Sequence, residues 1–247
     1  MLLLLLSLHL VAGPVPVRAP LRFKIVTRSS TDIDLSAAGQ GSQTVTLIST
    51  TFVSVTLSDT TGGRLASIVI DSSTFDGGSV AAQLPAEMST DPKGASFHLY
   101  IVDGKSTSAI SPTPASIQAA QAAGGIELIL AGLRTAMPGD SWTDTTKTDT
   151  TMAAGSAKGS RVAVWTAKSA DQGGALQLDA TWTGTTSAGF GQAQMDMQVT
   201  GASHVTAVAG ELSQKANSTG TGSATMNVAG MSLPMKVTTE ITTMQIP

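Results

Sequence analysis

Few side chains of this chain are of the types that carry out catalysis. Histidine occurs three times, as His9, His98 and His204, and cysteine is absent. Without cysteine there is no disulfide, thiol nucleophile or cysteine-based zinc site. His98 and His204 would need a Ser or Asp partner brought close by folding, and the commoner place for such a histidine is the exposed face of a strand. A three-histidine metal site is excluded, because His9 lies in the N-terminal apolar run.

Catalytic sequence motifs are also missing. The chain contains no G-x-S-x-G, no H-E-x-x-H and no glycine-rich phosphate loop between a strand and a helix. We therefore expect a protein that is not an enzyme and that requires no cofactor and no metal.

Acidic residues and tryptophans suggest two further binding chemistries. "TDTTKTDTT" (143–151) sets Asp144 and Asp149 among threonines, which would suit calcium only if more oxygens converged there. A solvated strand explains the same pattern more simply. Trp142, Trp165 and Trp182 would form a sugar-binding platform if exposed, but core packing with a bonded indole N–H is the favoured interpretation.

Methionine is the unusual residue of the second half. In "GFGQAQMDMQVTG" (189–201), Met195 and Met197 alternate with polar residues, as on a strand with one apolar face. Six of the ten methionines follow residue 190. Methionine is flexible and polarisable and suits surfaces that accept varied apolar partners. Filling of an irregular core under the helices is the alternative, whereas copper binding would require denser methionine clusters or nearby histidine.

The first hypothesis is therefore a concave apolar site. Its mechanism would be desolvation of an acyl-like chain, with affinity set by the apolar area buried and with no covalent step. The candidate wall residues are Leu178, Trp182, Met195, Met197, Met226, Met235 and Val237 from strands, with Ile129, Leu130 and Leu133 from a helix.

Strands must position these residues. The alternation in 42–76 around "TTGG" (60–63) predicts a long hairpin, and Asp103-Gly104 predicts a tight turn in a second hairpin. Further strands are predicted near 140–152, 159–170, 174–188, 191–203, 205–217, 221–230 and 233–246. Their short connections favour antiparallel meander pairing.

Residues 113–137 predict a helical insert. Thr113 and Pro114 suit a helix start, and Gly124 suits its end. A second helix is expected from Ile126 to Met137, where apolar residues recur at helical spacing.

The fold class that follows is mainly β. We expect a large, strongly curved antiparallel sheet (a half-barrel meander of about ten strands) with a small two-helix insert covering one opening or face. Residues 20–247 would form a single β domain, with a first β half at 21–112, the insert at 113–137 and a second β half at 138–247.

Composition and the N-terminus indicate the compartment. Only 13% of residues are charged and the net charge is −3, so a nucleic-acid partner is disfavoured. Residues 1–19 are expected to be a signal peptide, which predicts a periplasmic or secreted protein. No later run is apolar enough for a membrane helix. An outer-membrane barrel is disfavoured by the 4% aromatic content and by the terminal Pro247.

A family resemblance accompanies these patterns. "KGASFHLYIVDGK" (93–105), an amphipathic helix ending in Pro, and "PGDSW" (138–142) occur in that order. The chain resembles a group of uncharacterised exported bacterial proteins and lipoproteins. The resemblance implies a curved half-barrel similar to that of lipoprotein-carrier proteins, and it implies no activity. Many members carry a lipidated cysteine that this chain lacks.

Two functional hypotheses remain open. The first is an exported, non-enzymatic protein that binds a lipid or another apolar small molecule in the concave face of the sheet. The alternative is a structural or protein-interaction module of the bacterial cell envelope, with a packed interior, no ligand cavity and another envelope protein as its partner.

Overall fold

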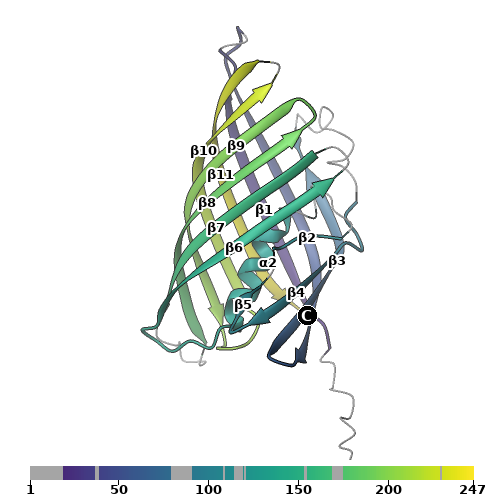
Figure 1. Cartoon of the computed structure of the whole chain (residues 1–247), viewed down its shortest axis with the longest axis vertical. Helices are drawn as coiled ribbons and strands as arrows, with labels where there is room; N and C mark the ends of the chain where they lie inside the picture. The colour runs from purple at the N-terminus through teal and green to yellow at the C-terminus, as the bar shows by residue number, and fades with distance from the viewer. Residues whose placement is uncertain are drawn as a thin grey trace, which may run out of the picture.

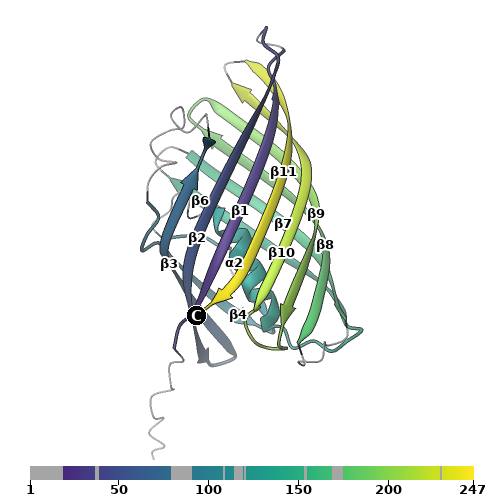
Figure 2. The same ribbon diagram turned by 180° about the vertical axis from the view of Figure 1, so that it is seen from behind.

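The structure, a computed structural model, is a single antiparallel sheet curled into a barrel around a short helix (Figures 1 and 2). It describes residues 19–36, 39–78, 91–107, 109–113, 119, 121–152, 155–168, 175–228 and 230–247. Within these ranges the sheet has 11 strands. The strands are β1 (Leu21–Asp34), β2 (Ser42–Thr60), β3 (Gly63–Asp76), β4 (Ser96–Val102), β5 (Lys105–Ser106), β6 (Ser141–Met152), β7 (Gly155–Lys168), β8 (Leu176–Phe190), β9 (Ala193–Ala207), β10 (Lys215–Val228) and β11 (Met231–Ile246).

The strand order places the first and the last strand side by side in the middle of the sheet. The order is β5-β4-β3-β2-β1-β11-β10-β9-β8-β7-β6, with β1 and β11 paired antiparallel along most of their length. The predicted hairpin at 42–76 is confirmed as β2 and β3. The predicted turn at Asp103 and Gly104 is confirmed as well, with φ values of 49° and 74°.

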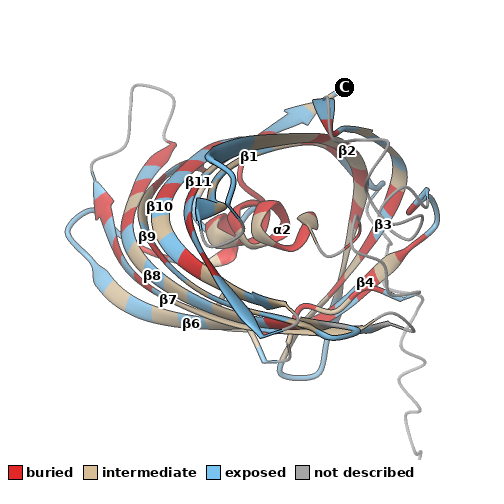
Figure 3. Ribbon diagram, turned by 90° about the horizontal axis from the view of Figure 1, so that it is seen from above, coloured by how far each residue is buried: buried red, intermediate tan, exposed pale blue. Residues whose placement is uncertain are grey.

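The sheet curls further than the half-barrel that the sequence predicts. Ile110 forms a bridge to Thr148 on β6, and Thr113 forms a bridge to Ser96 on β4. Segment 109–113 therefore lies between the two edges of the sheet and joins them. The predicted fold class, a mainly β and strongly curved antiparallel sheet with a helical insert, is confirmed, and the barrel is nearly closed (Figure 3).

The helix lies inside the barrel (Figure 3). α2 (Ala123–Leu130) continues directly into the 3-10 turn η4 (Ala131–Leu133). The prediction that Gly124 ends a helix is wrong, because Gly124 and Gly125 both lie within α2. A Cβ on Gly125 would lie 2.4 Å from the Cγ2 of Ile25, and one on Gly124 would lie 2.8 Å from the Cδ1 of Ile241. These glycines therefore let α2 approach β1 and β11 closely. The helix predicted from Pro114 lies mostly outside the described residues.

One predicted strand is also wrong. Residues 205–217 are not a strand: β9 continues to Ala207, a turn follows, and β10 begins at Lys215. The break predicted between residues 217 and 221 falls at Gly220, which resembles a chain break but lies within β10. The expected signal peptide (1–19) lies outside the described residues except for its last one.

Alternation along the strands separates an inner and an outer face. Inward positions of β1–β4 and α2 form one buried core, which includes Phe23, Ile25, Phe97 and Ile129. Outward positions are rich in threonine and serine, with some exposed apolar side chains such as Val162 and Val164, and one row pairs Thr183, Thr200, Thr221 and Thr238 in register. The barrel thus has a mainly apolar interior and a hydroxyl-rich exterior.

Candidate binding chamber in the barrel lumen

Trp182 of β8 is part of the inner face of the barrel. Its indole lies against β9 and β10, where a Cβ on Gly201 or Gly220 would come within 2.5 Å of the ring. Its Nε1 donates a hydrogen bond to the Ser218 Oγ at 3.1 Å. The two glycines are therefore required in mid-strand because the sheet accommodates a flat aromatic ring there.

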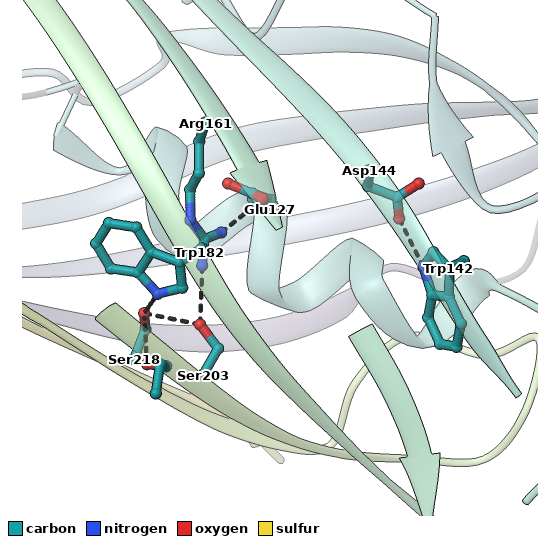
Figure 4. A network of polar contacts seen from close by, with 8 residues as sticks. Glu127, Trp142, Asp144, Arg161, Trp182, Ser203 and Ser218 are labelled. Carbon is teal, nitrogen blue, oxygen red and sulfur yellow. Dashed lines mark hydrogen bonds and ion pairs between the residues drawn. The ribbon is translucent and has the colours of Figure 1, made fainter. Parts of the chain in front are cut away.

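Arg161 and Glu127 connect this wall to the helix (Figure 4). The Arg161 guanidinium lies over the Trp182 ring, with Cζ 4.5 Å from the centroid. It forms an ion pair with Glu127 of α2 and donates to the Ser203 Oγ at 2.8 Å. The two charged side chains are only 16% and 14% exposed. Removal of one partner from such a pair would leave an uncompensated, largely buried charge.

A cavity of about 210 Å³ adjoins this ion pair, between α2 and strands β6–β9. Its lining combines the ion pair and hydroxyl groups with apolar side chains, including Met197 and Val199. Part of this space stays empty because Gly184, which lies directly opposite Arg161 on the neighbouring strand, has no side chain to fill it. The full lining is Ile110, Ala123, Gly124, Glu127, Thr146, Thr148, Gly159, Ser160, Arg161, Trp182, Gly184, Thr185, Thr186, Met197, Val199 and Thr239.

A methionine cluster lies beyond the cavity. Cross-strand neighbours place Met195 opposite Met226, and Ala224 between Met197 and Met235. The cluster, called here the methionine end, consists of Ala224, Met235 and Val237, which are buried, and of Ile33, Met195, Met197 and Met226, which are half-buried. No residue of α2 belongs to it. Met197 belongs to both the cluster and the cavity wall, so the two are continuous.

The structure thus brings five of the ten candidate wall residues together and separates the others. Met195, Met197, Met226, Met235 and Val237 meet at the methionine end, and Trp182 lies beside the cavity. The other four are packed in the two cores around the helix, with Ile129, Leu130 and Leu133 in one core and Leu178 in the other. These two cores together are called here the filled end.

Sequence reasoning missed Glu127 and Arg161. One signal could have found Glu127, because it is the single charged residue of α2 and charged residues are rarely buried without a partner. Its partner Arg161 could not be identified from the sequence, since only the folded structure brings β7 close to α2.

A second cluster of the same chemical type lies where the sheet edges meet. Arg134 lies over Trp142 at 4.8 Å, and the Trp142 Nε1 donates to Asp144 at 2.8 Å. Asp144 also forms ion pairs with Lys105 and Arg134, at 2.8 and 3.5 Å. The solvated strand expected here is thus wrong for Asp144, which is 21% exposed and paired. Within the described residues, no group of three His, Asp or Glu side chains could hold a metal ion.

The predicted place of both remaining histidines is confirmed, since each is exposed on the outer face of its strand. His98 lies between the hydroxyls of Ser67 and Ser96. The Nδ1 of His204 lies 2.8 Å from Asp179, which also pairs with Lys168. Burial raises the pKa of Asp179, but the hydrogen bonds and charges of Lys168 and His204 outweigh this and lower the pKa below its ordinary value.

A hollow larger than the lumen cavity lies on the outer face. It measures about 680 Å³ and is open to solvent, and it is lined mainly by threonines of β8–β11 with Val162 and Val164 of β7. Solvated hydroxyl groups provide little net binding energy, because water competes for their hydrogen bonds. The lumen is therefore the stronger candidate site, despite its smaller volume.

Comparisons with known proteins give no family. No family model matches the chain, and no curated protein matches it, so the resemblance based on "KGASFHLYIVDGK" and "PGDSW" stays a prediction. Solved structures that align with it include a mutant of the Rhodopseudomonas blastica porin, at 7% identity and a TM-score of 0.27, covering 90% of this chain and 99% of that one. A BenF-like porin from Pseudomonas fluorescens aligns at 6% identity and a TM-score of 0.30, covering 92% and 99%. Similarity this low carries no conclusion about function. No helix among the described residues is long and apolar enough to cross a membrane.

Proposed function

We propose that this protein is an exported, non-enzymatic binding protein that holds an apolar or amphipathic small molecule in the barrel lumen. One observation carries the proposal: half-buried methionines of β9 and β10 face inward at the methionine end, next to a cavity that their own Met197 helps to line. Half-buried apolar side chains inside a barrel are a surface that a ligand can cover.

Burial of a small apolar chain would supply the free energy of binding. Each methylene group removed from water contributes about 0.8 kcal/mol. Flexible thioether side chains adapt to chains of different shape. The cavity of about 210 Å³ is smaller than the roughly 300–1,000 Å³ of pockets that enclose a whole drug-sized ligand. It would therefore hold one end of the ligand, and the methionine end would cover the rest.

The hydroxyl-rich outer face favours a barrel whose exterior is in contact with water. A barrel that spans an outer membrane presents an apolar band to lipid. Here Thr183, Thr200, Thr221 and Thr238 form an exposed hydroxyl row across the strands that such a band would occupy. With the expected signal peptide at 1–19 and a single domain at 20–247, we propose a periplasmic or secreted location. The alternative function, an envelope interaction module, would use the same polar face but would need no inner cavity.

Gly184 provides the test of ligand binding. A Cβ on Gly184 would have no neighbour closer than 3.7 Å, so the larger side chain of Gly184→Leu can enter the cavity. Gly189→Leu is the matched control: it lies on the same strand, and a Cβ there would have no atom within 4 Å. The probe is N-phenyl-1-naphthylamine, an uncharged fluorescent apolar molecule, titrated into the purified chain.

We expect the wild type and Gly189→Leu to bind the probe with equal affinity and Gly184→Leu to bind it at least about tenfold more weakly. The urea midpoint of each variant shows that it remains folded. Equal probe binding by all three folded proteins would contradict binding in the lumen. Absence of probe binding by the wild type would favour the interaction module.

A further inference from the structure

The charges in the cavity lining balance each other. Among its lining residues only Glu127 and Arg161 carry charge, and they are paired with each other. The other polar groups that line it are hydroxyls, including those of Thr146, Thr186 and Thr239. The wall on which a ligand's head group would rest therefore has donors and acceptors but no net charge.

Arg161 is already held on three sides. One terminal nitrogen pairs with Glu127, the other donates to Ser203, and the plane of the guanidinium lies on Trp182. Arginine has five N–H donors, so it can still donate to a neutral hydroxyl or carbonyl group. A carboxylate head group would have to lie beside Glu127 in a largely buried site, where two like charges repel strongly.

We propose that Glu127 is a specificity-determining residue, which makes the chamber select amphiphiles with an uncharged, hydroxylated head group over fatty-acid anions. The inference rests on the proposed function and narrows its ligand class. The head group lies against Arg161, Glu127 and the threonine hydroxyls, and the chain extends past Met197 into the methionine end. Electrical neutrality of the wall, more than any single hydrogen bond, sets the preference.

The test compares two ligands with the same chain. Monododecanoylglycerol and dodecanoate compete with N-phenyl-1-naphthylamine at neutral pH, where dodecanoate is ionised. For the wild type we expect monododecanoylglycerol to bind at least about tenfold more tightly than dodecanoate. Glu127→Gln keeps the shape of the side chain but leaves the Arg161 charge uncompensated, so dodecanoate should gain about tenfold through a charge-assisted hydrogen bond.

Two further variants separate selectivity from a purely structural role. The double variant Glu127→Gln/Arg161→Gln restores neutrality, so it should return to the wild-type preference. Asp144→Asn removes the carboxylate of the similar Arg134–Trp142 cluster where the sheet edges meet, and it should leave the ratio of the two affinities unchanged.

The outcomes distinguish selectivity for an uncharged head group from ligand binding in the lumen itself. Equal affinities of the wild type for the two ligands, with the probe still bound, would overturn the selectivity and leave the proposed function in place. An unchanged ratio in folded Glu127→Gln would also overturn it, as would a dodecanoate preference in the double variant. If Glu127→Gln does not fold, Arg161→Gln is measured in its place: it leaves Glu127 without its cation, so dodecanoate should bind still more weakly relative to monododecanoylglycerol, and an unchanged ratio would overturn the selectivity. No binding of the probe by the wild type would overturn both proposals.

Discussion

The two ends of the barrel use the same strands for different purposes. At the filled end, inward side chains such as Phe23 of β1 and Val205 of β9 are almost completely buried. At the methionine end, Met195, Met197 and Met226 face inward as well but remain half-buried. The difference shows that strand alternation fixes only the direction of a side chain. Whether that side chain belongs to a core or to a site depends on what fills the space opposite.

Truncation of a core aromatic should separate the two ends most clearly. Phe97→Ala removes a side chain that is 0% exposed, and we expect it to lower the free energy of unfolding by about 3–5 kcal/mol. Met226→Ala at the methionine end should cost about 1–2 kcal/mol, since its side chain already contacts solvent. Urea denaturation followed by tryptophan fluorescence measures both. Equal costs would mean that the methionine end is packed as tightly as the filled end.

Addition of one methyl group tests the boundary between the ends. A Cβ on Gly201 would lie 2.1 Å from the Thr219 carbonyl oxygen and 2.5 Å from the Trp182 ring. We therefore expect Gly201→Ala to destabilise the fold by about 1–3 kcal/mol through overpacking. It should also displace Trp182, which would change the indole fluorescence of the folded protein.

Gly189→Ala is the control for this change, because a Cβ there would have open space around it. Its stability should stay within about 0.5 kcal/mol of the wild type. If Gly201→Ala were equally harmless, the ring of Trp182 would not be seated against β9.

The sequence predicted the directions of side chains better than the ends of elements. Alternation with period two placed Met195, Met197, Met235 and Val237 on the inner face, and the structure agrees because each pairs in register with an inward neighbour. The errors at Gly124 and at Gly220, where a strand break was predicted, share one physical cause. Glycine ends elements in isolated chains, but here tertiary packing against Ile25, Ile241 and the Trp182 ring requires it inside them.

The candidate site could be predicted only in part. The methionines were visible as a pattern, so five candidate wall residues that the fold brings together at one end could be named from the sequence. The same reasoning also included Leu178, Ile129, Leu130 and Leu133, because an apolar stripe looks identical whether it faces a cavity or a partner helix. Pairing of Glu127 with Arg161 depends on how α2 lies in the lumen, which no local pattern encodes.

The smallest effect should come from the outer face, where the partners of the ion-paired carboxylate Asp179 are more than half exposed, unlike Arg161 in the lumen. The pKa of Asp179 is lowered: burial raises it, but Lys168 and His204 lower it by more in sum. The folded state therefore favours the ionised carboxylate, and this contribution is complete above the ordinary pKa of 3.8 and is lost as the pH falls through the lower folded-state pKa. Since Lys168 and His204 are 58% and 56% exposed, it should amount to no more than about 1 kcal/mol. Asp179→Asn should thus be slightly less stable than the wild type at pH 6 and equally stable at pH 2, whereas a gap that persists at pH 2 would assign the effect to packing and not to charge.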